Sequence, residues 1–191
     1  MIAQIYVYDI VFGGMADALV KQFVHQMQSE FEMSLVGELT YFLGLQVKQM
    51  EDTIFISQRK YAKNIVKKFG MESATHKRTP AATHLKLTKD KKGVSVDQSL
   101  YRSIIGSLLY LTSSRLDISF AVGVCARYQA EPKMSHLTQV KRILKYVNGT
   151  SDYGIMYSHG EDSRLIGYCD ADWADSADDR KNTSGGCFKF N

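Results

Sequence analysis

Proline, tryptophan and cysteine are scarce in this chain. Its 191 residues include two prolines, one tryptophan and three cysteines. The cysteines are odd in number, stand far apart and never form a Cys-x-x-Cys pair, which predicts neither a disulfide framework nor a zinc site. A reducing compartment is therefore expected.

Long apolar runs are also missing. No stretch approaches the roughly 18 consecutive apolar residues that a membrane-spanning helix needs. The first residues show no basic segment followed by an apolar one, as a signal peptide would. With 45% hydrophobic and 23% charged residues, the composition is ordinary for one or two globular domains. An intracellular protein without a membrane segment is expected.

Charge is nearly balanced overall, at +4, but it is unevenly distributed. A charged helix face is usually only solvated, whereas a helix with many cations and no acid suits a phosphate backbone, where counterion release drives binding. The predicted helix over 57–69 is of this second kind, and the predicted helix from residue 135 has a smaller basic group on its outer side. The candidate nucleic-acid-binding cations are Arg59, Lys60, Lys63, Lys67, Lys68, Lys141, Arg142 and Lys145.

The first residues predict a β-hairpin with an acid at its tip. Apolar and aromatic residues alternate over 5–8, an aliphatic run follows Asp9, and Gly13 and Gly14 end the second strand. The turn is expected near Tyr8 and Asp9. An aspartate at a hairpin tip is commonly a turn former, because its side chain bonds its own backbone two residues on.

Further elements follow in order. Asp17 is expected to cap a helix reaching Phe31, a second hairpin covers 37–57, and Ser57 is expected to cap the basic helix. The stretch 72–98 loses all periodicity and is interpreted as a linker. Three helices follow, over 101–112, from Asp117 to Pro132 and from Ser135 to residue 149. Strands over 153–157 and 165–170 flank a polar turn at 159–162, and a last strand covers 187–190.

Several segments resemble copia-type retrotransposon polyproteins. Tyr6-Val7-Tyr8-Asp9 is similar to the Tyr-x-Asp-Asp palm hairpin of reverse transcriptases, and Tyr41-Phe42-Leu43-Gly44 looks like the primer grip. Gly44 would let a primer end approach closely, although a glycine bulge in an ordinary strand explains it equally well. The segments 101–111, 115–118 and 144–150 closely resemble the thumb and connection region. Leu116 stands where that family usually has proline.

The last residues resemble the opening of the ribonuclease H domain that follows the polymerase in this family. By that match Asp170, at the end of a strand, would be the first metal-binding acid. Asp172, Asp175, Asp178 and Asp179 are expected to be loop and capping residues. The resemblance weakens at Asp175, Asn182 and Gly186, where glycine, serine and an aromatic residue are expected.

The resemblance implies an α+β fold: a partial reverse transcriptase palm hairpin with thumb and connection helices, then the first strands of a ribonuclease H-like domain. It assigns 1–71 to the palm end with primer-grip hairpin and thumb helix, 72–98 to a linker, 99–150 to a helical thumb and connection module, and 151–191 to ribonuclease H. The fingers, most of the palm and most of the nuclease are expected to be absent. Phe42, Leu43 and Gly44 join the candidate nucleic-acid-binding residues.

The same resemblance predicts incomplete metal sites at Asp9 and Asp170. The family uses Mg²⁺ held by several carboxylates. Tyr8 stands where the motif has its first acid, and a phenol with a pKa near ~10 is neutral at pH 7. The other carboxylates are expected to lie outside this chain. No bound cofactor is therefore expected.

Three functions remain open at this point. The first is a segment of a copia-type reverse transcriptase and ribonuclease H polyprotein, inactive alone, whose parent acts on an RNA/DNA template-primer duplex. The second is a binding module that grips duplex nucleic acid through its basic helices without chemistry. The third is a chain with no selected role that folds poorly, because a palm sheet without its partner strands exposes an edge and apolar surface.

Overall fold

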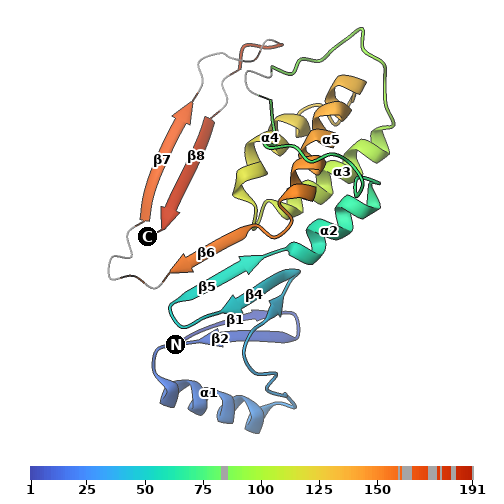
Figure 1. Ribbon diagram of the computed structural model, residues 1–191. Coiled ribbons are helices and arrows are strands. Elements are labelled where there is room, and N and C mark those ends of the chain that lie inside the picture. The colour runs from blue at the N-terminus through green and yellow to red at the C-terminus, as the bar shows by residue number, and fades with distance from the viewer. Residues whose placement is uncertain are drawn as a thin grey trace. The chain divides into compact units, whose positions relative to one another are not determined.

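The computed structural model describes residues 1–82, 86–158, 160, 165–171, 176, 178–181 and 184–190 (Figure 1). The chain divides into two compact units, Met1–Phe42 and Leu43–Asn191. Helices and strands are mixed in the chain, as the expected α+β class requires. In the described ranges, no helix combines the length and apolar character needed to cross a membrane.

The first unit is built on the predicted hairpin. Strands β1 (Ile2–Tyr6) and β2 (Asp9–Gly13) pair antiparallel, with Tyr6 opposite Asp9. The turn falls on Val7 and Tyr8, one residue earlier than expected, and Val7 has a φ of 55°. Asp9 is therefore the first residue of β2. Helix α1 (Asp17–Glu30) and the short strand β3 (Tyr41–Phe42) complete this unit.

Helix α1 rests on the hairpin through aromatic contact. The ring centroids of Phe12 and Phe23 lie 5.2 Å apart. Asp17 does not cap the helix, because it is the first helical residue and Ala16 occupies the cap position without a side-chain hydrogen bond. No residue of this unit is fully buried.

The second unit contains an antiparallel sheet made from distant segments. Strands β4 (Leu45–Gln49) and β5 (Thr53–Ser57) form the predicted second hairpin. Strand β6 (Gly154–Ser158) pairs with the other edge of β5, from Thr53 opposite Ser158 to Ser57 opposite Gly154. Figure 1 shows the orange β6 directly beside the teal β5.

The two strands predicted around the polar turn at 159–162 therefore belong to different ladders. β6 joins β5, whereas β7 (Leu165–Ala171) pairs with β8 (Ser184–Phe190), which begins three residues earlier than expected. Most of the predicted turn, residues 159, 161 and 162, lies outside the described residues.

Helix α2 (Arg59–Lys68) follows β5 directly. Ser57 was expected to cap it, but Ser57 ends β5, and Gln58 holds the cap position without a side-chain cap bond. The Gln58 side chain instead points into the protein. It donates from Nε2 to the Tyr110 carbonyl at 3.3 Å and accepts from Ser114 Oγ at 2.7 Å. This buried amide ties α2 to the end of α3.

The predicted helical module is present. It consists of α3 (Gln98–Leu111), a 3₁₀ turn η1 (Leu116–Ile118), α4 (Ser119–Ala126) and α5 (Met134–Gly149). Asp97 caps α3 by accepting hydrogen bonds from the backbone of Ser99 and Leu100. Together with α2, these helices enclose the core: Ala62, Ile65, Val66, Tyr101, Ile104, Ile105, Leu108, Leu111, Ile118, Ala121, Val122, Cys125, Leu137, Val140, Ile143, Leu144, Tyr146 and Val147.

Two expected helix starts were wrong. Asp117 does not cap α4, because it lies within η1 and its carboxylate accepts hydrogen bonds from Arg115, the residue before η1. Helix α5 begins at Met134 and not at Ser135, since the buried His136 accepts a hydrogen bond from the Lys133 backbone at 3.0 Å. In both cases a side chain, that of Asp117 or of His136, forms a hydrogen bond that helix propensity alone does not predict.

The stretch 72–98 was predicted as a linker, and its described residues, 72–82 and 86–98, contain no strand and reach helix only at Gln98. Its described parts nevertheless lie against the helices. Leu87 and Val96 pack on the core, and the Val96 backbone donates to the Pro132 carbonyl at 3.1 Å. His136 Nε2 lies 2.7 Å from the Thr88 carbonyl. The assignment of domains to 1–71, 72–98, 99–150 and 151–191 stays a prediction.

Candidate nucleic-acid interface

The predicted cations of α2 lie on the outside of the helix. Ala62, Ile65 and Val66 enter the core, which leaves the opposite face to solvent. Within the described residues none of these cations forms an ion pair, and the side-chain contacts seen are those of Lys68, to Ser103 Oγ at 3.3 Å and over the Phe69 ring. The exposed set is Arg59, Lys60, Lys63, Lys67 and Lys68.

The predicted cations of α5 are not equivalent. Lys141 is exposed and Lys145 half-buried. Arg142 is half-buried and contacts the protein itself, because its guanidinium donates to the Thr79 carbonyl at 3.2 Å and to Thr79 Oγ1 at 2.8 Å. A role for all three in binding phosphate stays a prediction, but the structure gives Arg142 a second task.

The segment that looks like a primer grip is not a continuous strand. Leu43 and Gly44 lie in a turn with φ of 49° and 78°, between β3 and β4. The Tyr110 hydroxyl donates to the Leu43 carbonyl and fills the space that a Gly44 side chain would need. Glycine is thus explained by an internal contact. Phe42 ends β3, with its ring 6.1 Å from that of Tyr6.

The predicted palm acid is a surface residue. Asp9 is exposed at the start of β2, and the neighbouring Tyr8 is 91% exposed. Across the part of the chain that the structure describes, no three histidine, cysteine or acidic side chains come together as a metal cluster. A single aspartate beside a phenol does not fit a two-metal polymerase centre, which needs several carboxylates.

The predicted ribonuclease H acid belongs to β7, where Asp170 pairs with Gly185 of β8. Its side chain, and all of Asp172, Asp175 and Asn182, lie outside the described residues. Gly186 pairs with Cys169 in the same hairpin. Asp178 accepts a hydrogen bond from the Lys89 backbone, and Asp179 accepts one from Ser176 Oγ, so both serve loops as expected.

Sequence reasoning missed a buried ionic cluster around Arg115. The Arg115 guanidinium binds Asp117 through both carboxylate oxygens at 2.9 and 2.7 Å, and reaches the Thr150 carbonyl at 2.7 Å. The Tyr146 hydroxyl also donates to Asp117, at 2.7 Å. Burial opposes ionisation of Asp117, but the hydrogen bonds from Arg115 and Tyr146 hold its pKa below the ordinary value. The cluster joins η1 to the end of α5.

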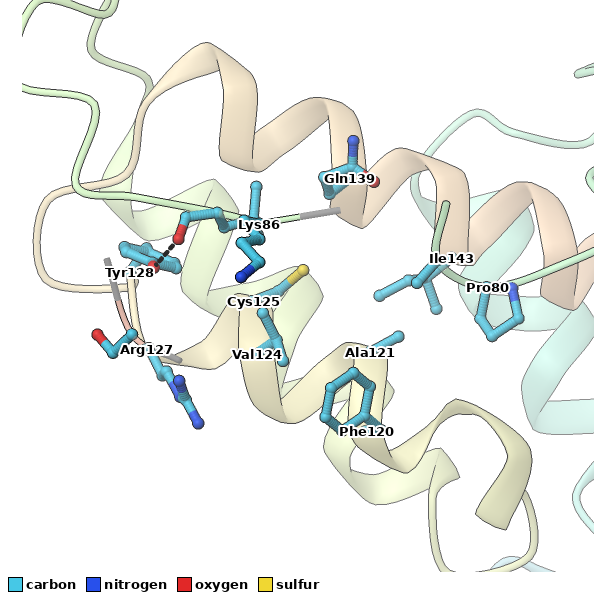
Figure 2. A pocket seen from close by; sticks show the side chains of 13 residues that line it. Pro80, Lys86, Phe120, Ala121, Val124, Cys125, Arg127, Tyr128, Gln139 and Ile143 are labelled. Atoms are coloured by element: carbon cyan, nitrogen blue, oxygen red, sulfur yellow. Dashed lines mark hydrogen bonds between the residues drawn. The ribbon is translucent and has the colours of Figure 1, made fainter. Parts of the chain in front are cut away.

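A small cavity opens between α4, α5 and the chain around Lys86 (Figure 2). It holds about 90 Å³, and Phe120, Val124 and Ile143 supply apolar lining. Gln139 Oε1 is buried here without a hydrogen-bond partner among the described residues. Cys125 lines the same cavity. Its own burial raises the pKa of its thiol to about 12, so this cysteine is not an activated nucleophile.

Comparisons with known proteins find one family model and several relatives. Residues 1–83 match the family described as "Reverse transcriptase (RNA-dependent DNA polymerase)". An uncharacterized mitochondrial protein of Arabidopsis thaliana, AtMg00810, is 36% identical over 184 residues, which is 96% of this chain and 76% of that protein. No solved structure matches the chain.

Two further relatives are much longer than this chain. The retrovirus-related Pol polyprotein from transposon RE2 of Arabidopsis thaliana is 36% identical over 181 residues, or 95% of this chain and 12% of the polyprotein. The Pol polyprotein from transposon TNT 1-94 of Nicotiana tabacum is 33% identical over 199 residues, or 100% of this chain and 15% of the polyprotein. The chain thus belongs to the copia-type retrotransposon Pol family and corresponds to a segment of the polyprotein that includes part of its reverse transcriptase domain.

Proposed function

We propose that this chain is a segment that holds duplex nucleic acid and that it does not synthesise DNA on its own. The observation that carries the proposal is α2: five exposed cations, no acid in the helix, and no ion pair to any described residue. Cations left unpaired by their own protein are available to phosphates, and each phosphate contact releases condensed counterions. The partner that fits is the RNA/DNA duplex of the parent family.

The absence of independent polymerase activity rests on chemistry at the β1–β2 turn. Nucleotidyl transfer needs several anionic oxygens around Mg²⁺ to neutralise the developing charge. Asp9 offers one carboxylate, and Tyr8 offers a phenol hydroxyl in the place of another. We also propose that β7 and β8 are the opening strands of a ribonuclease H-like domain, with Asp170 as its first acid. The family resemblance and the β7–β8 pairing support this assignment.

Salt dependence tests the binding proposal. A fluorescent RNA–DNA hybrid is titrated with the whole chain at 50 to 200 mM salt, and log Kd is plotted against log salt. Several phosphate contacts give a slope of roughly 0.9 for each contact. A flat plot contradicts the proposal.

Two matched variants locate the contacts. Lys63→Ala with Lys67→Ala removes two exposed cations from α2, and the slope is expected to fall by about 1–2. Lys91→Ala with Lys92→Ala removes the same charge from an exposed turn before α3, and the slope is expected to stay unchanged. Equal slope losses in both variants would mean that only net charge matters.

Primer extension tests the proposal that the chain does not synthesise DNA on its own. With an RNA template, a DNA primer and Mg²⁺, the whole chain is expected to give no more product than its Asp9→Asn variant. Extension by the wild-type chain that disappears in Asp9→Asn would show that Asp9 finds carboxylate partners, and the proposed inactivity would then be wrong.

A further inference from the structure

The segment after α2 adds a second line of cations beside α5. We call residues 71–82 the strap. It starts at the end of α2, where the Met71 backbone donates to the Val66 carbonyl at 2.9 Å, and it contains no helix or strand. It carries Lys77 and Arg78, both exposed, and one acid, Glu72, near its start.

The strap is fixed to one face of α5. Asn148 Nδ2 donates to the carbonyls of Met71 and Glu72, each at 3.1 Å. The Lys77 backbone donates to the Lys145 carbonyl at 3.4 Å, and the Arg142 guanidinium holds Thr79. The three contact points on α5 stand three residues apart, so they follow one face of the helix. Residues 71–76 therefore stay near the end of α5, and from Lys77 to Thr79 the strap runs antiparallel to the helix.

Close packing fixes the middle of the strap as well. A side chain on Gly149 would meet the His76 side chain at 3.1 Å, so the strap lies tightly on the end of α5. This anchoring holds Lys77 and Arg78 against α5, a helix that also carries the exposed Lys141 and the half-buried Lys145. α5 contains no acid, and in the described chain none of these four cations forms an ion pair.

We infer that Lys77 and Arg78 are phosphate-binding residues, held in place by Arg142 as a positioning residue. The inference rests on the proposed function and extends it from α2 to the strap and α5. Because α2 packs against α5, the strap cations and the α2 cations belong to the same folded body and can act on one duplex. Arg142 acts through Thr79, since its Nε and Nη2 groups both donate to that residue.

The test uses the same hybrid and salt titration on the whole chain. Lys77→Ala with Arg78→Ala is expected to lower the slope by about 1–2, as the α2 variant does, whereas Lys91→Ala with Lys92→Ala leaves it unchanged. A slope that falls in the α2 variant but not in the strap variant overturns the strap inference alone. A flat slope for the wild type overturns the proposed function and the inference together.

Arg142→Lys tests positioning at constant charge. A lysine cannot reproduce the two donors that reach Thr79, so the strap loosens and affinity is expected to fall several-fold. In the background of Lys77→Ala with Arg78→Ala, the same change is expected to have almost no effect, because the residues it positions are gone. An equal loss in both backgrounds overturns the positioning role and indicates that Arg142 binds phosphate directly. Circular dichroism melts of all variants confirm that they are folded.

Discussion

At the scale of single residues, Arg115 is a buried cation held by several partners. It is 2% exposed, and its guanidinium donates to both Asp117 and Thr150. The guanidinium carbon also lies 5.5 Å from the ring centroid of Tyr146 and 5.3 Å from that of Tyr153. A buried cation is tolerated only when it is paired and hydrogen-bonded. Asp117 is therefore needed to keep Arg115 inside the protein.

Asp117→Asn is expected to lower stability by about 2 kcal/mol at pH 7, less than the ~3–5 kcal/mol of a fully buried pair because Asp117 is partly exposed. The lowered pKa of Asp117 means that its contribution is full above the ordinary aspartate pKa and disappears as pH falls through the folded value. Urea unfolding at pH 7 and near pH 2 measures this. The gap between wild type and variant should shrink in acid, and a constant gap would contradict the ionic explanation.

Gln139 illustrates the opposite case, a polar group whose burial is not compensated. Its Oε1 is buried without a hydrogen-bond partner among the described residues, and the residue lines a partly apolar cavity. Gln139→Met keeps the volume and removes the unpaired acceptor, so stability is expected to rise by about 1 kcal/mol. Thermal unfolding measures the change, with Gln129→Met at an exposed position as the control. A loss of stability would mean that Oε1 has a partner.

At the scale of elements, apolar periodicity predicted the α2 to α5 helices and the β1–β2 and β4–β5 hairpins. It did not predict where several of them begin. Ser57 has the chemistry of a cap, yet β5 continues through it, since pairing opposite Gly154 outweighs capping. Glycine was equally ambiguous: Gly44 suits either a bulge or a close approach, and only the fold shows that the Tyr110 hydroxyl is the group that approaches.

Gly44→Ala is expected to cost more than Gly70→Ala. Both glycines have positive φ, 78° and 66°, so each alanine is strained by about 1 kcal/mol. Nothing lies near the added methyl at Gly70, whereas at Gly44 it meets the Tyr110 hydroxyl. Adding Tyr110→Phe to Gly44→Ala should recover part of the loss in chemical unfolding. Equal costs for the two glycines, or no recovery, would show that the Tyr110 contact is unimportant.

At the scale of the whole molecule, burial is unequal between the two units. Residues 1–42 contain no fully buried side chain, whereas α3 and α5 contribute most of the core. Hydrogen exchange of the intact chain is expected to be fast throughout β1, β2 and α1 and slow in α3 and α5, because opening of the first unit exposes little apolar surface. Protection of β1 and β2 as strong as that of α3 would contradict this.

The candidate site was predictable only in part for a related reason. Composition alone identified the cations of α2, since a helix without acids is visible in the sequence. The strap could not be predicted, because it is held in place by Asn148 and Arg142, about 70 residues further along the chain. Its own sequence has no hydrophobic periodicity. Tertiary hydrogen bonds to an irregular segment produce no recognisable pattern in the sequence of that segment.

The pairing of β5 with β6 also bears on how the chain is made. Ser57 pairs with Gly154, which is synthesised about a hundred residues later. At a translation rate of ~5–20 residues per second, one edge of β5 stays open on the ribosome for about 5–20 seconds. During that interval α2, α3, α4 and α5 are all synthesised. The helices can therefore fold before β6 pairs with β5.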